Sequence, residues 1–263
     1  MRWLAPATAV AIVLAGCGSE GGAPDRPPSP QTSAVLRYSI DSGFTHSARA
    51  QMAVRPPGVR RPPLLVFLHG RTGGPETIVG EEFLAAERSL GRRAPAVVLP
   101  DGGDHSYYHD RRDGLWGRYV MDEVIPNALR RLHADPHRVA IGGISMGGFG
   151  AYDLALHDPR RFCAVGGHSP AIWVSAGQTA PGAFDDAADF ARNDVVAMAR
   201  QRRPAPHLWI DAGDADPFLP GDRALAAALR IRLRTSPGGH EAAYWRSHFD
   251  DYLRFYARAL ARC

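Results

Sequence analysis

The sequence contains no lysine, so its formal net charge of +4 arises from 31 arginines set against 27 acidic residues in a chain of 263. Basic and acidic residues are interspersed, and arginine pairs such as Arg60-Arg61 and Arg202-Arg203 are expected on solvated surface. Proteins that bind nucleic acid usually gather their basic residues into one patch or run. The charge pattern therefore predicts no nucleic-acid partner.

Long apolar runs are also rare. The run from Leu4 to Leu14 follows Arg2 and is too short to cross a bilayer as a permanent helix. It ends in Leu14-Ala15-Gly16-Cys17, which resembles the lipobox of bacterial lipoproteins, where the cysteine is lipid-modified after cleavage. We therefore expect a signal peptide over residues 1–16 and a lipid anchor at Cys17. The alternative is an ordinary secretory signal with an incidental cysteine.

Residues 17–33 are rich in Gly, Pro and Ser, and this composition predicts a lipidated tether that does not fold. Residues 34–263 are enough for one sizeable core, because 45% of the whole chain is hydrophobic. They predict a single folded domain. The expected location is the outer face of the bacterial cytoplasmic membrane, where the lipid anchor would hold the exported protein.

Cysteine is scarce, with only Cys163 and Cys263 besides Cys17. An exported chain meets an oxidising environment, in which these two cysteines can form a disulfide. Such a bridge would attach the last helix to a central strand and close a loop of about 100 residues, contributing about 4 kcal/mol on a chain-entropy estimate. The alternative is a buried thiol and an unpaired terminus.

Apolar runs alternate with helical patterns along the domain, which predicts an α/β fold with a mostly parallel sheet of about eight strands and helices on both faces. Residues 35–40 and 48–54 alternate apolar and polar side chains, as half-exposed antiparallel strands do. Residues 64–68 and 96–99 are continuously apolar, as strands covered on both faces are. Further strands are predicted at 138–142, 163–167, 207–211 and 231–235, and helices at 75–90, 115–133, 148–157, 224–230 and 243–260.

The pentapeptide Gly143-Ile144-Ser145-Met146-Gly147 lies between one of these strands and a helix. A serine in a strained turn needs neighbours without a Cβ so that the backbones can pass closely. Ser145 is therefore the candidate nucleophile. The Met146 N–H, at the start of the helix, is a natural donor to a developing oxyanion.

A nucleophilic serine needs a histidine base and a carboxylate that orients it. The base is predicted to follow the last strand, where His240 lies in a glycine-flanked loop. Three carboxylates lie at or after the end of the strand at 207–211, the first of them, Asp211, still on the strand. Asp216 is the preferred acid because it projects from a loop fixed by Pro217, while Asp211 and Asp214 remain alternatives or loop-supporting groups.

Other residues at this edge of the sheet are candidates for substrate contact. The Arg71 N–H is expected to be the second oxyanion donor, because its glycine-rich loop follows an early central strand. A short cap is predicted over residues 171–199. The candidate lining residues, for which simple packing is the alternative, are Asp101, Tyr107, Tyr108, Trp116 and His168.

From about residue 35 to 260 the chain resembles the esterase D-like branch of the α/β-hydrolases, which includes S-formylglutathione hydrolases, acetyl and feruloyl esterases and mycolyltransferases. The resemblance rests on Leu68-His69-Gly70, Pro100-Asp101-Gly102, Asp135-Pro136-His137-Arg138-Val139, Gly143-Ile144-Ser145-Met146-Gly147-Gly148, Asp211-x-Gly-x-x-Asp216-x-Phe218 and Gly239-His240. It implies an α/β-hydrolase fold. It also implies a triad of Ser145, Asp216 and His240, with an oxyanion hole formed by the N–H groups of Arg71 and Met146.

These features predict an exported serine esterase that acts through an acyl-enzyme, without metal or cofactor, on small-molecule or lipid or sugar esters. An acyltransferase of the mycolyltransferase type, in which a sugar or lipid hydroxyl replaces water, is the first alternative. A cell-surface binding protein on a hydrolase scaffold is the second. Export argues against a glutathione thioester as substrate, because glutathione is chiefly cytosolic.

Overall fold

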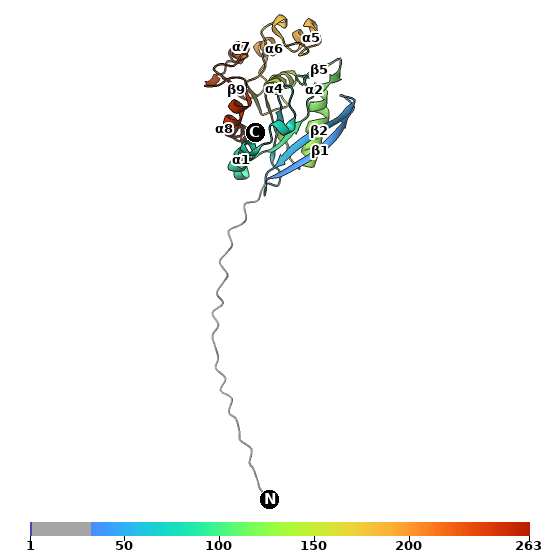
Figure 1. Ribbon diagram of the computed structural model, residues 1–263, viewed down its shortest axis with the longest axis vertical. Helices are drawn as coiled ribbons and strands as arrows, with labels where there is room; N and C mark the ends of the chain where they lie inside the picture. Colours follow the sequence, from blue (N-terminus) through green and yellow to red (C-terminus); the bar gives the residue numbers. More distant parts are fainter. Residues whose placement is uncertain (2–32) are drawn as a thin grey trace. The chain divides into compact units, whose positions relative to one another are not determined.

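A computed structural model describes Met1 and residues 33–263, and every helix and strand discussed below lies in the second range (Figure 1). The predicted signal peptide, the anchor at Cys17 and nearly all of the predicted tether lie outside the described residues. Among the helices of residues 33–263, none has the length and apolarity that crossing a membrane requires.

The central sheet has eight strands in the order β1-β2-β4-β3-β7-β8-β9-β10. All neighbouring pairs are parallel except those that involve β2, which runs opposite to β1 and β4. The fold class predicted from the sequence is therefore confirmed. The strands are β1 Ala34–Ser42, β2 Ser47–Arg55, β3 Pro63–Leu68, β4 Ala96–Pro100, β7 Asp135–Ile144, β8 Ala164–His168, β9 His207–Gly213 and β10 Leu233–Ser236, and a separate hairpin joins β5 Asp110–Arg111 to β6 Gly114–Leu115.

Helices cover both faces of the sheet. They are α1 Glu81–Ser89, α2 Trp116–Arg118, α3 Ile125–Arg131, α4 Met146–His157, α5 Ala187–Arg192, α6 Val195–Gln201, α7 Leu219–Leu229 and α8 Ala242–Leu260, with short turns η1 Pro75–Thr77, η2 Gly91–Arg93 and η4 Ala176–Gln178 and a π-helical segment η3 Tyr119–Val124. On one face α1 lies beside α8 (Figure 1), and Phe83, Tyr252 and Tyr256 fill the core beneath them. On the other face lie α3, α4, α6 and α7, and the core between them and the sheet includes Val139 of β7, Phe149 of α4 and Leu225 of α7.

Two predicted helices depart from a single regular α-helix. Within residues 75–90, the turn η1 and helix α1 are separated around Gly80, which caps α1 in an extended conformation. Within 115–133, residues 116–131 remain helical throughout, but the hydrogen-bond pattern changes from α to π over Tyr119–Val124, just before Pro126, which has no N–H to donate. Glycine and proline thus cause irregularities that the apolar periodicity alone did not show.

The predicted disulfide is present between Cys163 and Cys263, whose Cα atoms are 6.0 Å apart. Cys163 directly precedes β8, and Cys263 follows the end of α8. The bridge therefore attaches the last helix to the middle of the sheet. Since α8 begins just after His240, its position also bears on the candidate site.

Candidate active site

Ser145 occupies a sharp turn between β7 and α4. Its backbone angles are φ 55° and ψ −116°, a strained conformation for a residue with a Cβ. A Cβ at Gly147 would lie 2.2 Å from the carbonyl oxygen of Leu68, and one at Gly143 would lie 2.5 Å from the backbone of Gly147. The two glycines are therefore required where the sequence predicted close backbone contact.

The three predicted side chains meet at the carboxyl edge of the sheet. The Nε2 atom of His240 lies 2.8 Å from the Oγ of Ser145, and the Nδ1 atom lies 2.9 Å from an Oδ of Asp216. Ser145 is 8% exposed and the side chain of His240 is 19% exposed, whereas the Asp216 side chain is fully covered. The serine and histidine are thus accessible to a small molecule, and the carboxylate is shielded behind them.

The charge of Asp216 is stabilised despite its burial. Burial raises the pKa of Asp216, but the hydrogen bonds from His240 and from the backbone N–H of Phe218 outweigh it and hold the pKa below the ordinary value of 3.8. An ionised Asp216 accepts the Nδ1 proton of His240. The Nε2 atom then has a free lone pair toward Ser145, which is the tautomer that a general base needs.

The loop that carries His240 is fixed by the end of β9. The Gly238 N–H donates to the Asp214 carboxylate at 3.2 Å, and the Ala215 N–H donates to the Gly238 carbonyl at 3.0 Å. A Cβ on Gly213 would lie 2.2 Å from the Gly238 oxygen, so the two segments pass in close contact. Asp214 is therefore a loop-supporting group, as one alternative from the sequence held.

Two backbone N–H groups are free to receive an oxyanion. Met146 is the first residue of α4, so its N–H has no acceptor within the helix. The Arg71 N–H donates to no acceptor in the part of the chain that the structure describes. Gly70 brings this loop close to the nucleophile, since a Cβ there would lie 3.5 Å from the Cβ of Ser145.

His69 supports the Arg71 loop and was not assigned a role from the sequence. It is 1% exposed, and burial lowers its pKa, so the ring is neutral. The Nε2 atom accepts the Gly102 N–H at 2.9 Å, which leaves the Nδ1 proton for the Gly70 carbonyl at 2.8 Å. The motif Leu68-His69-Gly70 was visible in the sequence, but its role depends on a loop 33 positions away.

A cavity of about 530 Å³ opens in front of Ser145 and His240. Its wall combines apolar side chains with two arginines: Ile78, Tyr107, Ala180, Phe218, Trp245, Arg71 and Arg246. Of the lining residues predicted from the sequence, Tyr107 is present. The rings of Phe218 and Trp245 pack against the imidazole of His240, with centroids at 4.9 and 5.1 Å.

Three of the other candidate lining residues do not belong to the cavity wall. Tyr108 is fully buried, and its hydroxyl accepts the backbone N–H of His69 at 3.1 Å. Trp116 is 5% exposed and stacks beneath Arg49. Asp101 forms an ion pair with Arg49 at 3.5 Å and accepts the Gly103 N–H at 2.8 Å. All three shape the loop after β4 and do not face the cavity.

His168, which the sequence offered as a possible lining residue, does not reach the cavity wall. It is completely buried, with Nδ1 2.8 Å from an Oδ of Asp211 and Nε2 2.9 Å from the Tyr256 hydroxyl. Burial lowers its pKa more than Asp211 raises it. Asp211 is therefore the partner of a second His–Asp pair, on the side of the sheet that faces α8, and not the acid of the candidate triad.

The segment predicted as a cap packs against the loop before β5. Phe184 lies in a cluster with Tyr107, Phe149 and Trp173, with ring centroids 5.6–6.3 Å from its own. Arg111 donates to the Gly182 carbonyl at 2.7 Å and pairs with Asp185. From this segment Ala180 reaches the cavity wall.

A mostly parallel sheet with a strained serine, a histidine and an aspartate at its carboxyl edge defines a serine hydrolase of the α/β-hydrolase class. Residues 47–256 match the Esterase family, described as "Putative esterase". The chain belongs to this family and is a serine carboxylic-ester hydrolase.

Known proteins of similar sequence and fold agree with this assignment. The S-formylglutathione hydrolase of Paracoccus denitrificans is 26% identical over 245 residues, covering 78% of this chain and 86% of the relative. A solved S-formylglutathione hydrolase from Agrobacterium tumefaciens has a TM-score of 0.76 at 21% identity, over 87% of this chain and 96% of its own. A ferulic acid esterase has a TM-score of 0.75 at 22% identity, over 87% and 98%. At these identities the two solved structures show the common fold.

Proposed function

We propose that this protein hydrolyses carboxylic esters outside the cytoplasm through an acyl-enzyme on Ser145, with His240 as general base and acid and Asp216 as the group that orients it. The observation that carries the proposal is the continuous hydrogen-bonded path from Ser145 through His240 to Asp216, at 2.8 and 2.9 Å, at the edge of an open cavity. A purely binding role would not require this path.

In the first half-reaction, Ser145 Oγ attacks the ester carbonyl carbon while His240 Nε2 takes the hydroxyl proton. The negatively charged oxygen of the tetrahedral intermediate would accept hydrogen bonds from the backbone N–H groups of Arg71 and Met146. His240 then gives its proton to the leaving alcohol. In the second half-reaction, water attacks the acyl-serine by the same proton path, releasing the acid and regenerating the serine.

The proposed substrates are small-molecule, lipid or sugar esters of the cell envelope. The cavity wall is largely apolar, which fits an acyl or aryl group, while the exposed residues Arg71 and Arg246 add positive charge to it. The run Leu4–Leu14 and Cys17 are the basis for proposing export and lipid anchoring. An exported enzyme would not meet the substrate named for its S-formylglutathione hydrolase relatives.

The chemistry is tested with the chain from Gly18 onward and p-nitrophenyl esters of increasing acyl length. We expect a burst of p-nitrophenol in the wild type and none in Ser145→Ala. S-formylglutathione serves as a comparison substrate and is expected to react poorly. A folded wild-type protein without activity on any ester would contradict the proposal, and acyl transfer to an added polyol in preference to water would favour an acyltransferase.

The location is tested separately in a bacterial host. The full chain is expected to incorporate labelled fatty acid and to fractionate with membranes, and Cys17→Ala is expected to abolish the label. Labelling of the Cys17→Ala variant, or absence of label in the wild type, would overturn the lipid anchor without affecting the proposed chemistry.

A further inference from the structure

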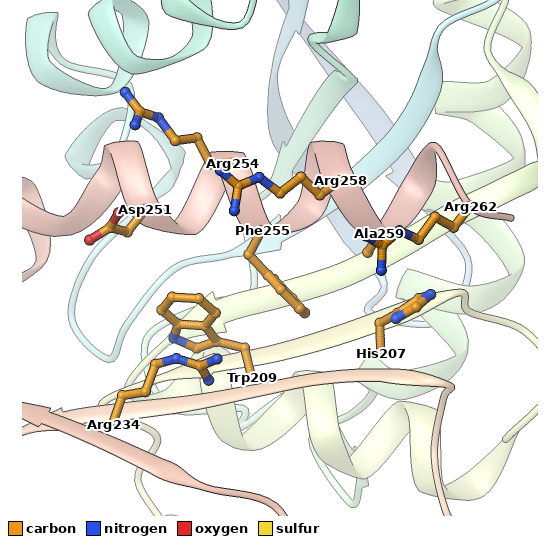
Figure 2. Close-up of a pocket in the computed structure, with 9 residues that line it drawn as sticks. All are labelled: His207, Trp209, Arg234, Asp251, Arg254, Phe255, Arg258, Ala259 and Arg262. Carbon is orange, nitrogen blue, oxygen red and sulfur yellow. The ribbon is translucent and has the colours of Figure 1, made fainter.

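Helix α8 carries a row of arginines that the esterase reaction does not use. Arg254, Arg258 and Arg262, called the arginine row below, are four residues apart and lie along one side of the last two turns of the helix and just beyond it (Figure 2). At 1.5 Å per residue the row extends about 12 Å. Residues three or four apart on a helix are close enough to repel when their charges are alike.

Two shallow cavities flank the row and add further positive charge. One, of about 410 Å³, lies between α8 and strands β9 and β10, with Arg234 and His207 opposite the row (Figure 2). The other, of about 370 Å³, lies toward α1 and includes Arg93. Asp251 is the acidic side chain of the first cavity, and the second has none. The surface is therefore strongly cationic on both sides of the helix.

Most of these arginines lack an acidic partner. Arg254 pairs with Asp250 at 2.6 Å. Within residues 33–263, neither Arg258 nor Arg262 forms an ion pair, and Arg93 and Arg234 also have none. Arg234 instead stacks on the Trp209 ring at 3.9 Å. Because Arg254 alone of the row has a counter-charge in an ion pair, the surface keeps an excess of positive charge that favours an anionic occupant, and one guanidinium group can donate two hydrogen bonds to phosphate oxygens.

The row lies away from the candidate active site. Helix α8 starts at Ala242, beside His240 at the carboxyl edge of the sheet, and ends near Cys263, which is bridged to the residue before β8. The arginine row belongs to its second half, toward the amino ends of the strands. An occupant of the row would leave the cavity in front of Ser145 open.

The point where the chain enters the domain lies on the same side. Ser33 donates a hydrogen bond to Glu87 of α1, and α1 packs against α8. If Cys17 is lipidated as proposed above, the 15 residues from 18 to 32 must connect the bilayer to this position, and a Gly-rich linker of that length has an average end-to-end distance of about 20 Å. The anchor would therefore hold the face formed by α1 and α8 close to the membrane.

We infer that the arginine row, with Arg93 and Arg234 beside it, docks on the phosphate groups of anionic phospholipids at the membrane surface. Trp209 lines the same cavity, and tryptophan is a side chain enriched at membrane interfaces. Docking would orient the domain with the carboxyl edge of its sheet, and hence the cavity at Ser145, away from the bilayer. The closeness of the α1 and α8 face to the membrane depends on the proposed anchor, whereas the charge of the surface does not.

The test uses the chain from Gly18 onward, which keeps every described helix and strand and lacks both Cys17 and the apolar run. Co-sedimentation is measured with phosphatidylglycerol vesicles and with neutral phosphatidylcholine vesicles at low and high salt. We expect binding to the anionic vesicles that weakens with salt. Each arginine near an anionic surface strengthens binding about fivefold, so Arg258→Glu/Arg262→Glu should weaken it by at least about 25-fold.

The matched control is Arg200→Glu/Arg223→Glu, which changes the net charge equally on exposed positions of α6 and α7, across the sheet from α8. It should weaken binding less than about threefold, since Arg200 and Arg223 would face away from the bilayer. Thermal unfolding of both variants checks that they are folded, and neither changes a residue of the proposed ester chemistry.

An equal loss in both variants, or equal binding to neutral vesicles, would overturn the docking surface. Release of the protein from the vesicles by inorganic phosphate, but not by sodium chloride of the same ionic strength, would also overturn the docking surface. It would indicate a site for a small free anion. None of these outcomes bears on the burst assay, so the two proposals fail independently.

Discussion

Two His–Asp pairs of nearly equal geometry lie in this molecule, and they do different work. His240 and Asp216 are 2.9 Å apart, and His168 and Asp211 are 2.8 Å apart. In the first pair the remaining ring nitrogen faces a serine hydroxyl at an open cavity. In the second it faces the hydroxyl of Tyr256 inside the core. The function of a His–Asp pair is thus set by what its second nitrogen faces.

The buried pair is satisfied on every side. Asp211 also accepts hydrogen bonds from Trp209 at 2.5 Å, Tyr252 at 2.8 Å and Tyr244 at 3.2 Å. Gly142 and Gly166 make room for Tyr256, because a Cβ at either position would lie within 2.1 Å of its hydroxyl. This network joins α8 to strands β7, β8 and β9, so it is expected to support stability, whereas the open pair is expected to support turnover.

His240→Ala should give the largest effect and separate the two pairs most clearly. Without the general base, kcat/KM on a p-nitrophenyl ester should fall by about 10⁴-fold or more. The free energy of unfolding should change by less than about 1 kcal/mol, because the ring is partly exposed and Asp216 keeps the N–H of Phe218. Steady-state kinetics and urea unfolding measure both. A variant with a tenth of wild-type activity would remove His240 from the chemistry.

Cys263→Ser tests whether the buried pair depends on the bridge that holds the end of α8. The bridge closes a separation of 100 residues, and its loss should lower the free energy of unfolding by about 4 kcal/mol. The initial rate of ester hydrolysis at 25 °C should stay within about threefold of wild type, since His240 lies at the opposite end of the helix. Unfolding with and without reductant provides the control, because reductant should affect only the wild type. Loss of ester hydrolysis without a decrease in the free energy of unfolding would contradict the expectation that the bridge supports stability and not turnover.

His168→Ala should lower the stability and change turnover little, which is the opposite of the result expected for His240→Ala. It would leave a buried carboxylate and the Tyr256 hydroxyl each short of a partner, at a cost of about 3 kcal/mol. The value of kcat should fall by less than about tenfold in protein that remains folded. His168→Gln retains one donor and should recover part of the stability. A large loss of kcat with unchanged stability would place His168 in the reaction.

The open pair could be predicted from the sequence, because its residues are ordered along the chain by the fold itself. Ser145 is identified by glycines that the backbone requires, and His240 follows the last strand. Asp216 was harder to choose, since Asp211, Asp214 and Asp216 lie within six positions of one another at the end of one strand. What distinguishes them is the loop geometry that directs Asp214 to Gly238 and Asp211 to His168.

The buried pair could not be predicted, because its partners are brought together by packing alone. His168 and Tyr256 are 88 positions apart, and a histidine after a central strand reads equally well as a site residue. Tyr107 and Tyr108 show the same limit. Both have positive φ, at 51° and 60°, and only the fold of their loop sends Tyr107 to the cavity and Tyr108 into the core.

The smallest effect concerns pH and isolates the charge state of the buried pair. Burial lowers the pKa of His168 below its ordinary value of 6.5. The unfolded chain therefore binds a proton below about pH 6.5 that the folded chain does not, and stability should fall as the pH decreases. One such group gives a slope of at most about 1.4 kcal/mol per pH unit.

Burial also lowers the pKa of His69 and His109, which contribute to the same slope. The test is therefore a difference: urea unfolding of the wild type and of His168→Gln between pH 5 and 7. Over this range the free energy of unfolding should fall less in the variant than in the wild type, by up to the contribution of one bound proton. Because the lowered pKa of Asp216 makes its contribution disappear only below about pH 4, Asp216 does not affect the comparison. Equal slopes in the two proteins would mean that His168 titrates alike in the folded and unfolded chains, which would contradict the lowered pKa expected from its burial.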